Sequence, residues 1–475
     1  MPSAVLILAT AAVWVGLLTR PRAFVTALLV TAPWPGLFVR AGWEFDAFRI
    51  GLILAPLLAV YGLQAGRLGV SRFPLLLLPV YAVGVGAWAL GARELLEYDA
   101  VRIVGFESRV AAQTTLCVWR SLLPLLIVSI GRDERDAERW LDAYSWSVFV
   151  LCCYGLFQAV AFVTLGTPVT PIFRDGLFGS ITEHATVNFF GVEFLRVHSF
   201  SREPKDLALF CVPALAWLFV RLNSPWNQRR RTDRIRLFVI SACALVTFAS
   251  SLLLMVPAMF AVIGWLRPRL SLPRRLRYWL GVMATLAPLM LPFLVISQSR
   301  VLGRFRTARS LLQPSREAPA LEFLRETWPR SAFGYGMGTQ AFYLLPRMPA
   351  EYAQKALDHR AAAGVDSMLV STLSDLGIPG LVLTLWVIGS ALSTRRSHAP
   401  VAWTIRAATG ATALMGIPLN PGQQGAILWL LVGLTCLAKR QAHYLACFES
   451  TDETEPQLKA RQLGREPFCQ TLEIP

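Results

Sequence analysis

The sequence is poor in charged residues and contains almost no lysine. Asp, Glu, Lys and Arg make up 16% of its 475 residues, whereas soluble proteins carry roughly 25%. Lysine occurs only four times, so nearly all of the net charge of +16 comes from arginine. Because 55% of the residues are hydrophobic, a polar surface cannot cover the apolar side chains. This composition excludes intrinsic disorder and an ordinary cytosolic enzyme, and it predicts a membrane protein whose surroundings include the lipid bilayer.

Common catalytic and metal-binding motifs are also missing. There is no Asp-x-Asp pair, no phosphate-binding P-loop, no His-Glu-x-x-His and no Gly-x-Ser-x-Gly. The cysteines lie mostly in apolar runs, so we interpret them as small buried side chains and not as a disulfide framework. We therefore expect neither a metal nor a cofactor. The basic loops lack interleaved aromatic residues, so nucleic acid is not an expected partner.

Apolar runs recur along the whole chain, and most approach the roughly 20 residues that a helix needs to cross a bilayer. They predict an all-α, polytopic transmembrane helix bundle of about 12 spans. The second run contains Pro33 and Pro35, so the first two runs form either a hairpin or one broken span. We expect no cleavable signal peptide. The runs lie near residues 3–18, 23–39, 48–65, 73–91, 114–130, 142–167, 205–221, 237–250, 252–266, 278–297, 367–393, 402–418 and 424–438.

The placement of arginine predicts the orientation, because short basic loops stay on the cytoplasmic side. Alternation then places two long loops outside, 168–204 and 298–366. We expect a membrane domain over residues 1–440, with 298–366 inserted as a small helical extracytoplasmic domain, and a disordered cytoplasmic tail over 441–475. Twelve spans would leave both termini inside, which is the count we prefer. The short basic segments are 229–236, 267–277, 395–396 and 439–440.

The first candidate site is the charged sequence that ends the first outer loop. Arg202, Glu203 and Lys205 flank Pro204, which suits the first turn of a helix. One interpretation is a hydrated helix start at the membrane surface. The other is a lipid-diphosphate site. Charged side chains at the membrane boundary are costly in free energy unless they are well hydrated or bind a ligand, and an arginine and a lysine beside a glutamate suit a diphosphate.

The second outer loop adds further cations. Arg300 and Arg304 are four residues apart and would share one helix face. We interpret most arginines of this loop as attracted to anionic lipids in general, and Arg316 as the exception, on the grounds of the resemblance described below. Arg120 interrupts an apolar run, where it either lines the bundle interior or pairs with a glutamate near the outer face.

The end of the second outer loop holds a glycine-rich turn and a carboxylate. Gly334, Gly336 and Gly338 permit tight turns and close backbone approach, although their spacing is not that of a dinucleotide fingerprint. Asp366 stands where the loop re-enters the bilayer, either as a hydrated helix cap or as a base in a partly dry site. The outer-loop histidines, His198 and His359, are weaker candidates, because a lone loop histidine is usually solvated.

These elements, in this order, resemble the bacterial O-antigen polymerase and O-antigen ligase superfamily from about residue 110 to 435. The resemblance is carried by Ser201–Ala208 (SREPKDLA), by the turn Thr247–Ser251 (TFASS), by Arg316 with the later Phe333–Gly338 (FGYGMG), and by Asp366–Gly380. Asp366 and Ser367 stand where ligases usually carry His and Asn, and this difference favours the polymerase side.

The resemblance implies a metal-independent, inverting glycosyltransferase of the bacterial inner membrane, with its active site facing the periplasm. Its donor and acceptor would be undecaprenyl-diphosphate-linked glycans, and the product an O-antigen or exopolysaccharide. Arg202, Lys205 and Arg316 would hold the diphosphate, and Asp366 would be the general base, with Glu203 as the second choice. A chain-length regulator or a flippase would be a further partner.

Two alternatives stay open. A ligase would transfer the finished glycan to the lipid A core and would differ in its acceptor. A polysaccharide or lipid transporter is the alternative of another class. Transporters show inverted repeats and charges near the bilayer midplane, whereas here the charges gather at the outer face and no repeat is visible.

Overall fold

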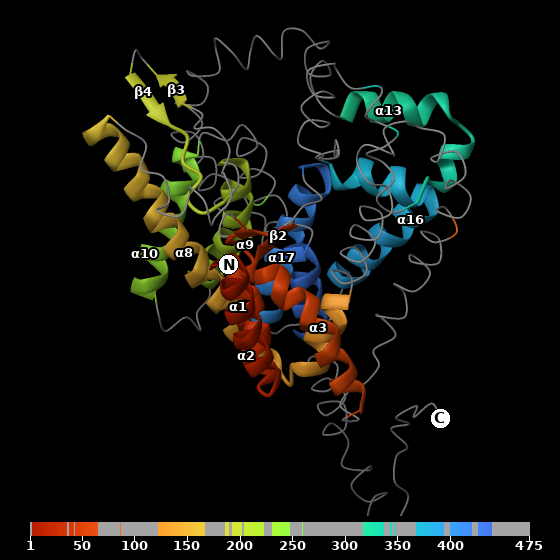
Figure 1. Cartoon of the computed structure of the whole chain (residues 1–475), viewed down its shortest axis with the longest axis horizontal. Helices are drawn as coiled ribbons and strands as arrows, with labels where there is room; N and C mark the ends of the chain where they lie inside the picture. Colours follow the sequence, from red (N-terminus) through yellow and green to blue (C-terminus); the bar gives the residue numbers. More distant parts are fainter. Residues whose placement is uncertain are drawn as a thin grey trace, which may run out of the picture.

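A computed structural model of the chain describes residues 2–35, 38–41, 43–64, 122–166, 186–189, 192–201, 204–222, 230–247, 317–336, 367–393, 400–419 and 426–438, with Gly86, Met259, Tyr343 and Arg347 as single positions. Most of these residues are helical (Figure 1). The expected helical fold class is therefore confirmed for the described segments. The number of spans stays a prediction, because the apolar runs 73–91, 252–266 and 278–297, like the tail 441–475, lie almost wholly outside them.

The helices occur in chain order with two short hairpins between them. Strands β1 and β2 pair antiparallel, with Phe38 opposite Asp46, and β3 and β4 pair with Thr186 opposite Leu195. These hairpins are the only strands within the described residues. Two further helices, over 122–130 and Ala426–Ala438, carry no label in Figure 1. The elements are α1 (Pro2–Leu18), α2 (Pro21–Thr31), β1 (Phe38–Ala41), β2 (Trp43–Asp46), α3 (Ala47–Gln64), α8 (Glu134–Leu165), β3 (Thr186–Phe189), β4 (Val192–Leu195), α9 (Pro204–Leu222), α10 (Arg230–Val246), α13 (Glu317–Glu326), the 3₁₀ turn η1 (Arg330–Phe333), α16 (Met368–Leu392) and α17 (Pro400–Leu419).

Helices α8 and α16 are long and apolar enough to cross a membrane. Helix α8 begins at the N-cap Asp133, whose side chain accepts from the Asp136 backbone N–H at 2.9 Å, and ends at Gly166 with φ 67°. Its first turns are charged, and the part from 143 to 165 contains no Asp, Glu, Lys or Arg. That part is about 34 Å long, which matches a hydrocarbon core of about 30 Å.

The apolar run predicted at 23–39 does not form one helix. Helix α2 ends at Thr31, and strand β1 begins at Phe38. Pro33 and Pro35 lie between them, and proline removes a backbone donor and disfavours helix in the residue before it. With 11 residues, α2 is about 16 Å long and cannot cross a bilayer by itself.

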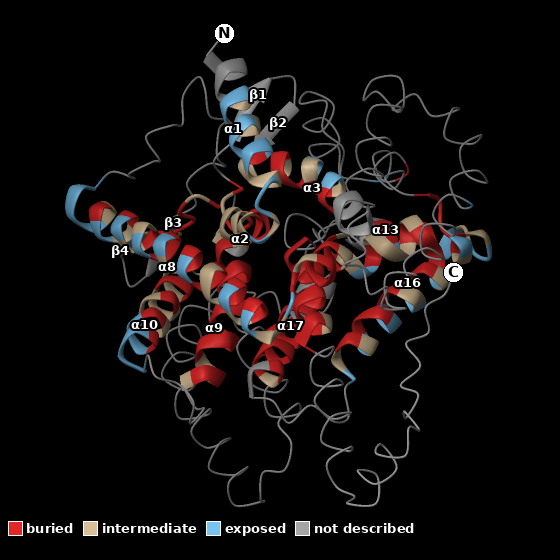
Figure 2. Ribbon diagram, turned by 90° about the horizontal axis from the view of Figure 1, so that it is seen from below, coloured by how far each residue is buried: buried red, intermediate tan, exposed pale blue. Residues whose placement is uncertain are grey.

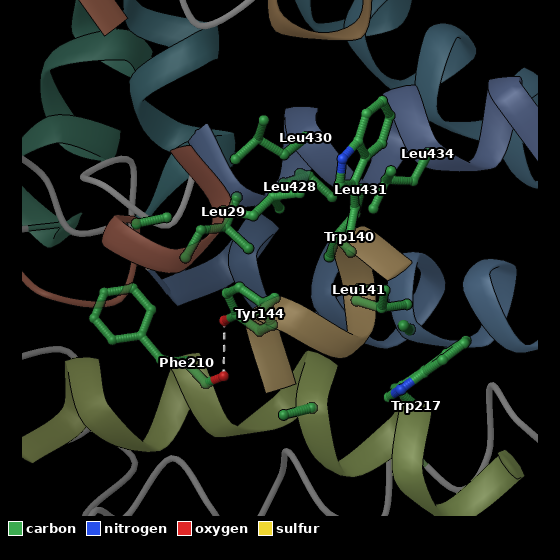
Figure 3. Packing of buried hydrophobic residues seen from close by; sticks show 14 of the residues in the cluster. Leu29, Trp140, Leu141, Tyr144, Phe210, Trp217, Leu428, Leu430, Leu431 and Leu434 are labelled. Carbon is green, nitrogen blue, oxygen red and sulfur yellow. Dashed lines mark hydrogen bonds between the residues drawn. The ribbon is translucent and has the colours of Figure 1, made fainter. Parts of the chain in front are cut away.

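The core lies where α9 and α17 pack against each other between the other helices (Figure 2). Leu207 through Leu218 of α9 are all buried, so this helix is surrounded by protein on every side. Small side chains on both helices, such as Ala208 and Ala411, let the two backbones approach closely. Figure 3 shows the Tyr144 hydroxyl of α8 donating to the Phe210 carbonyl of α9, at 2.8 Å.

A buried ionic cluster joins α8, α9 and α10. Asp142 Oδ1 of α8 accepts from Arg221 of α9 at 2.9 Å and from Arg236 of α10 at 2.8 Å. Both guanidinium groups also pair with Asp233, and Glu138 lies 3.9 Å from Arg221. Arg236 is 1% exposed and Asp233 is fully buried. Each buried charge therefore has opposite charges beside it, as buried ions require.

Two more contacts bring further helix ends to this cluster. Arg22, at the start of α2, lies 3.0 Å from Asp136 of α8. The Ala402 backbone N–H, at the start of α17, donates to Glu134 at 2.8 Å. The first turns of α2 and α17 therefore lie beside the first turn of α8, and the ionic cluster joins the following turns of α8 to the end of α9 and the start of α10. We call this edge of the bundle the arginine-rich end; its arginines are Arg20, Arg22, Arg132, Arg135, Arg139, Arg221, Arg230, Arg231, Arg234 and Arg236.

Candidate functional site

Most of the predicted site residues lie outside the described part of the chain. They are Arg120, Arg202, Glu203, Arg300, Arg304, Arg316, Gly338, His359 and Asp366. Lys205 is described only as part of the α9 backbone, whereas His198, Gly334 and Gly336 are described fully. The roles that we assign to the others stay predictions.

Four of these residues directly precede the start of a described helix. Arg202 and Glu203 come before α9, which begins at Pro204. Arg316 comes before α13, which begins at Glu317, and Asp366 comes before Ser367, the N-cap of α16. Helix N-termini carry partial positive charge and exposed backbone N–H groups, which favour anions.

Helix α16 is broken at Gly377, and this break organises the best-described candidate site. Gly377 has φ 67° and ψ −168°, a backbone region that is essentially restricted to glycine. Two positions further on, Pro379 has no backbone N–H. The carbonyls of Ser374 and Asp375, which would accept from residues 378 and 379 in a regular helix, thereby lose their usual donors.

The glycine-rich turn supplies the missing donors. The backbone N–H of Tyr335 donates to Ser374 O at 2.8 Å, and that of Gly336 donates to Asp375 O at 2.9 Å. The turn lies so close to the break that a Cβ atom on Gly334 would come within 2.5 Å of the Gly377 nitrogen. This is the close backbone approach for which such glycines are suited, and it brings together Gly334 and Gly377, which are 43 positions apart in the sequence.

Aromatic rings pack behind this turn. Phe323 of α13, Tyr335 and Tyr343 are all buried, with ring centroids 4.5 to 5.1 Å apart. The Arg330 guanidinium lies 5.5 Å from the centre of the Tyr335 ring, and that of Arg347 lies 4.6 Å from the centre of the Phe323 ring. Guanidinium groups at these distances are attracted to the ring faces, which orients them.

The break thus has both a cation and a carboxylate close to it. Arg330 begins the 3₁₀ turn that leads to Gly334, and Asp375 lies two residues before Gly377. Both side chains are partly exposed. A guanidinium can bind phosphate oxygens, and a carboxylate can accept a proton. Arg330 is among the outer-loop arginines that we interpreted as attracted to anionic lipids, and Asp375 lies within the element Asp366–Gly380, but neither was assigned a role in the reaction. The Gly-x-Pro-Gly pattern at 377–380 was the signal that could have indicated one.

A second irregular segment, Val197–Ser201, inserts beside the apolar part of α8. The Ser199 backbone N–H donates to Gln158 at 2.9 Å, and its hydroxyl donates to the Leu151 carbonyl at 2.8 Å. Ser199 has φ 53°, which is uncommon for a residue other than glycine. Within a bilayer, irregular backbone would be tolerated only where protein or a water-filled cavity surrounds it, and this segment is almost wholly buried by protein.

His198 belongs to this segment and is only 3% exposed. The expectation that it is a solvated loop side chain is therefore wrong. Its Nδ1 atom lies 2.9 Å from the Ser199 carbonyl oxygen. The segment is buried because Gly155 of α8 leaves room for it: a Cβ atom there would come within 2.8 Å of Val197.

The two irregular segments lie on different sides of α17. Helix α17 packs against α9 on one side and α16 on the other, and Figures 1 and 2 both show it between them. The structure thus brings Gly334 and Gly336 together with Gly377 and places His198 elsewhere, against α8. Within the described segments, no three His, Cys, Asp or Glu side chains converge as metal ligands would.

No protein-family model matches the chain, and no curated protein is significantly similar to it.

Proposed function

We propose that this chain is a multi-pass membrane glycosyltransferase that polymerises undecaprenyl-diphosphate-linked glycan repeats at the outer face of the bacterial inner membrane. The observation that carries the proposal is the glycine turn held against the break in α16. At this place the backbone of the glycine turn, three aromatic rings, a guanidinium and a carboxylate lie close together. The turn also joins two of the sequence elements on which the resemblance to O-antigen polymerases rests.

The direction of the helices supports an outer location for this site. The start of α17 belongs to the arginine-rich end, and only residues 393–399 connect it to the end of α16. Gly377 lies 15 residues before Leu392, which is about 22 Å along a helix. Because basic ends stay in the cytoplasm, the break would lie toward the opposite leaflet, where a lipid-linked glycan would arrive after translocation.

The proposed reaction needs no metal. A sugar hydroxyl of the acceptor attacks the anomeric carbon of the donor glycan from the side opposite the diphosphate, and undecaprenyl diphosphate leaves, so the anomeric configuration is inverted. Negative charge grows on the leaving diphosphate. Arg202, Lys205 and Arg316 would stabilise that charge, while Asp366 or Glu203 would take the proton from the acceptor hydroxyl.

Single substitutions test the assignment. Arg202→Gln, Arg316→Gln and Asp366→Asn should each lower polymerisation by about 100-fold or more, since loss of one preorganised charge-stabilising group raises a barrier by about 3 kcal/mol. Arg325→Gln is the control, because Arg325 is an exposed side chain on α13 that the proposal does not use. Polymer is measured by gel electrophoresis, with expression checked by blot. Normal elongation in all three variants would refute the proposed site.

The phenotype of a deletion strain separates the polymerase from the ligase. A polymerase deletion leaves a single repeat attached to the lipid A core. A ligase deletion leaves lipid-linked polymer of normal length that is not attached to the core. The second result would contradict the polymerase proposal while leaving the membrane architecture intact.

The broken helix favours one alternative of another class. Secondary transporters bind their substrates at discontinuous membrane helices, and α16 is such a helix. Purified protein in proteoliposomes decides between the two. Glycan or lipid uptake without formation of any glycosidic bond would support the transporter and contradict the transferase.

A further inference from the structure

At the arginine-rich end the acidic side chains of α8 and α10 are buried or partly buried, whereas arginines lie both inside and outside the bundle. Asp136 and Asp233 are buried and paired with arginines, and Asp142 lies in the ionic cluster. Glu134 and Glu138 are partly buried in contacts with α17 and α9. The exposed charged side chains of α8 and α10 in this region are all arginine: Arg135, Arg139, Arg230, Arg231 and Arg234.

The outward face of α8 changes from arginine to apolar side chains along its length. Arg135 and Arg139 are exposed in the first two turns. Trp146, Val150 and Phe157 are 39%, 49% and 54% exposed further along the same face, because residues spaced by three or four share one side of a helix. A protein surface in water would have polar residues along the whole of this stripe.

Helix α10 shows the same change on the neighbouring surface. Arg231 and Arg234 are exposed in its first two turns. Ile235 and Phe238 follow them with 51% and 74% of their surface exposed. Since α8 and α10 pack together, the two helices form one surface that is basic at one end and apolar beyond it.

Trp146 marks the boundary between the two zones. Its ring lies 4.5 Å from the Arg236 guanidinium, which fixes it at the junction of α8 and α10. From Trp146 to Leu165 is about 29 Å along the helix, close to the thickness of the hydrocarbon core. Arg139 lies about 10 Å before Trp146, so its long side chain can reach a headgroup layer that is about 5–7 Å thick on each side of the bilayer. Tryptophan itself is enriched at this interface.

We propose that the exposed arginines of α8 and α10 bind the phosphates of anionic phospholipids in the leaflet at the arginine-rich end. Guanidinium groups bind phosphate oxygens in a bidentate manner, and the apolar stripe directly beyond them fits the acyl chains of the same lipid. This continuity favours a lipid over a soluble polyanion. The proposal depends on α8 crossing the bilayer and not on glycosyl transfer.

Lipid binding to the purified full-length protein tests this inference. The protein in neutral detergent is titrated with phosphatidylglycerol or phosphatidylcholine, and bound lipid is counted by native mass spectrometry. Phosphatidylglycerol should bind more tightly, and its affinity should fall as salt is raised. Arg139→Gln should weaken it about fivefold, and the double variant Arg139→Gln/Arg231→Gln about 30-fold, as expected for arginines near an anionic surface.

The control is Arg325→Gln, which removes one exposed arginine from α13 and should leave phosphatidylglycerol binding unchanged. Because the Arg139 side chain is 75% exposed, its loss should not affect folding, which thermal unfolding checks. Equal binding of both lipids to the wild type would overturn the proposal. So would an equal loss in Arg139→Gln and Arg325→Gln, or competition by a soluble RNA oligonucleotide that has the same arginine dependence.

Discussion

The arginine-rich end and the break in α16 satisfy buried polar groups in opposite ways. At the arginine-rich end, Asp142, Asp233, Arg221 and Arg236 neutralise one another through side chains, and the helices stay regular. At the break the helix itself is interrupted, and backbone N–H groups from a distant turn occupy the freed carbonyls. The first region is held together by charge, and the second by the absence of side chains at Gly334 and Gly377.

This difference predicts which substitutions each region tolerates. The ionic cluster should be sensitive to loss of a charge and insensitive to small changes of backbone conformation. The break should be insensitive to charge and sensitive to a single added methyl group. A cluster that binds helices together is a structural element, whereas a break that has a partly exposed guanidinium and carboxylate close to aromatic rings is suited to binding a substrate.

The largest effect is expected for Arg236→Met. It leaves Asp233 and Asp142 with less compensating charge in a buried place, which should destabilise the protein by about 3–5 kcal/mol. Thermal unfolding in detergent measures this. Arg234→Met, two residues earlier and exposed, is the matched control and should be nearly neutral. If both variants unfold at the same temperature as the wild type, the cluster does not stabilise the bundle.

Gly377→Ala should have the next largest effect. Alanine is strained at φ 67°, and its Cβ atom would come within 2.3 Å of the Ala332 carbonyl oxygen, so the glycine turn must move. We expect a loss of about 3 kcal/mol, together with a loss of polymerisation. Gly389→Ala is the control, because that glycine lies on the same helix with nothing within 4 Å of an added Cβ. Equal stability of the two variants would contradict the close packing at the break.

Trp146→Leu should have a smaller effect, confined to the ionic cluster. It removes the ring that lies over Arg236, which should lower stability by about 1 kcal/mol. Trp386→Leu is the control, since Trp386 is an exposed tryptophan of α16. The difference between the two variants in thermal unfolding isolates the contribution of the cation–π contact, and no difference would show that this contact is negligible.

The smallest effect concerns Glu134, which lies before the apolar part of α8. Burial raises the pKa of this carboxyl above its usual value of 4.5, so folding favours its protonated form. The stability that this proton contributes is present at low pH and is lost as the pH rises through the raised pKa. Glu134→Gln keeps an acceptor for the Ala402 N–H and does not titrate. The stability of this variant should therefore fall less than that of the wild type as the pH rises. Unfolding temperatures measured from pH 4.5 to pH 8 check it: parallel profiles for the two proteins would contradict the prediction.

Sequence patterns predicted some parts of this structure because those patterns are local. The apolar run at 142–167 contains the apolar part of α8, which is long enough to cross a membrane, and the run at 367–393 contains α16. The glycines at 334 and 336 indicated a close backbone approach without indicating what they would approach. The run at 23–39 is interrupted where Pro33 and Pro35 indicated a break, because α2 ends at Thr31 and β1 begins at Phe38.

Other features depend on residues that are far apart in the sequence. Nothing near Asp142 indicates that Arg221 and Arg236 will reach it. Gln158 is a polar residue inside an apolar run, yet its partner Ser199 lies 41 residues away. The burial of His198 has the same origin, because the space for its segment comes from Gly155 on another helix.

The sequence by itself indicated lipid surroundings, through its few charges, its long apolar runs and its short basic segments of arginine. It also indicated the local conformation, through glycine where the backbone must turn. Those properties depend on each residue and its neighbours along the chain. Only the tertiary structure decided that Gly334 lies against Gly377, that the acids of α8 and α10 face inward while their exposed arginines face outward, and that α17 separates two irregular segments. These arrangements depend on how helices pack, and packing is a property of surfaces assembled from distant parts of the chain.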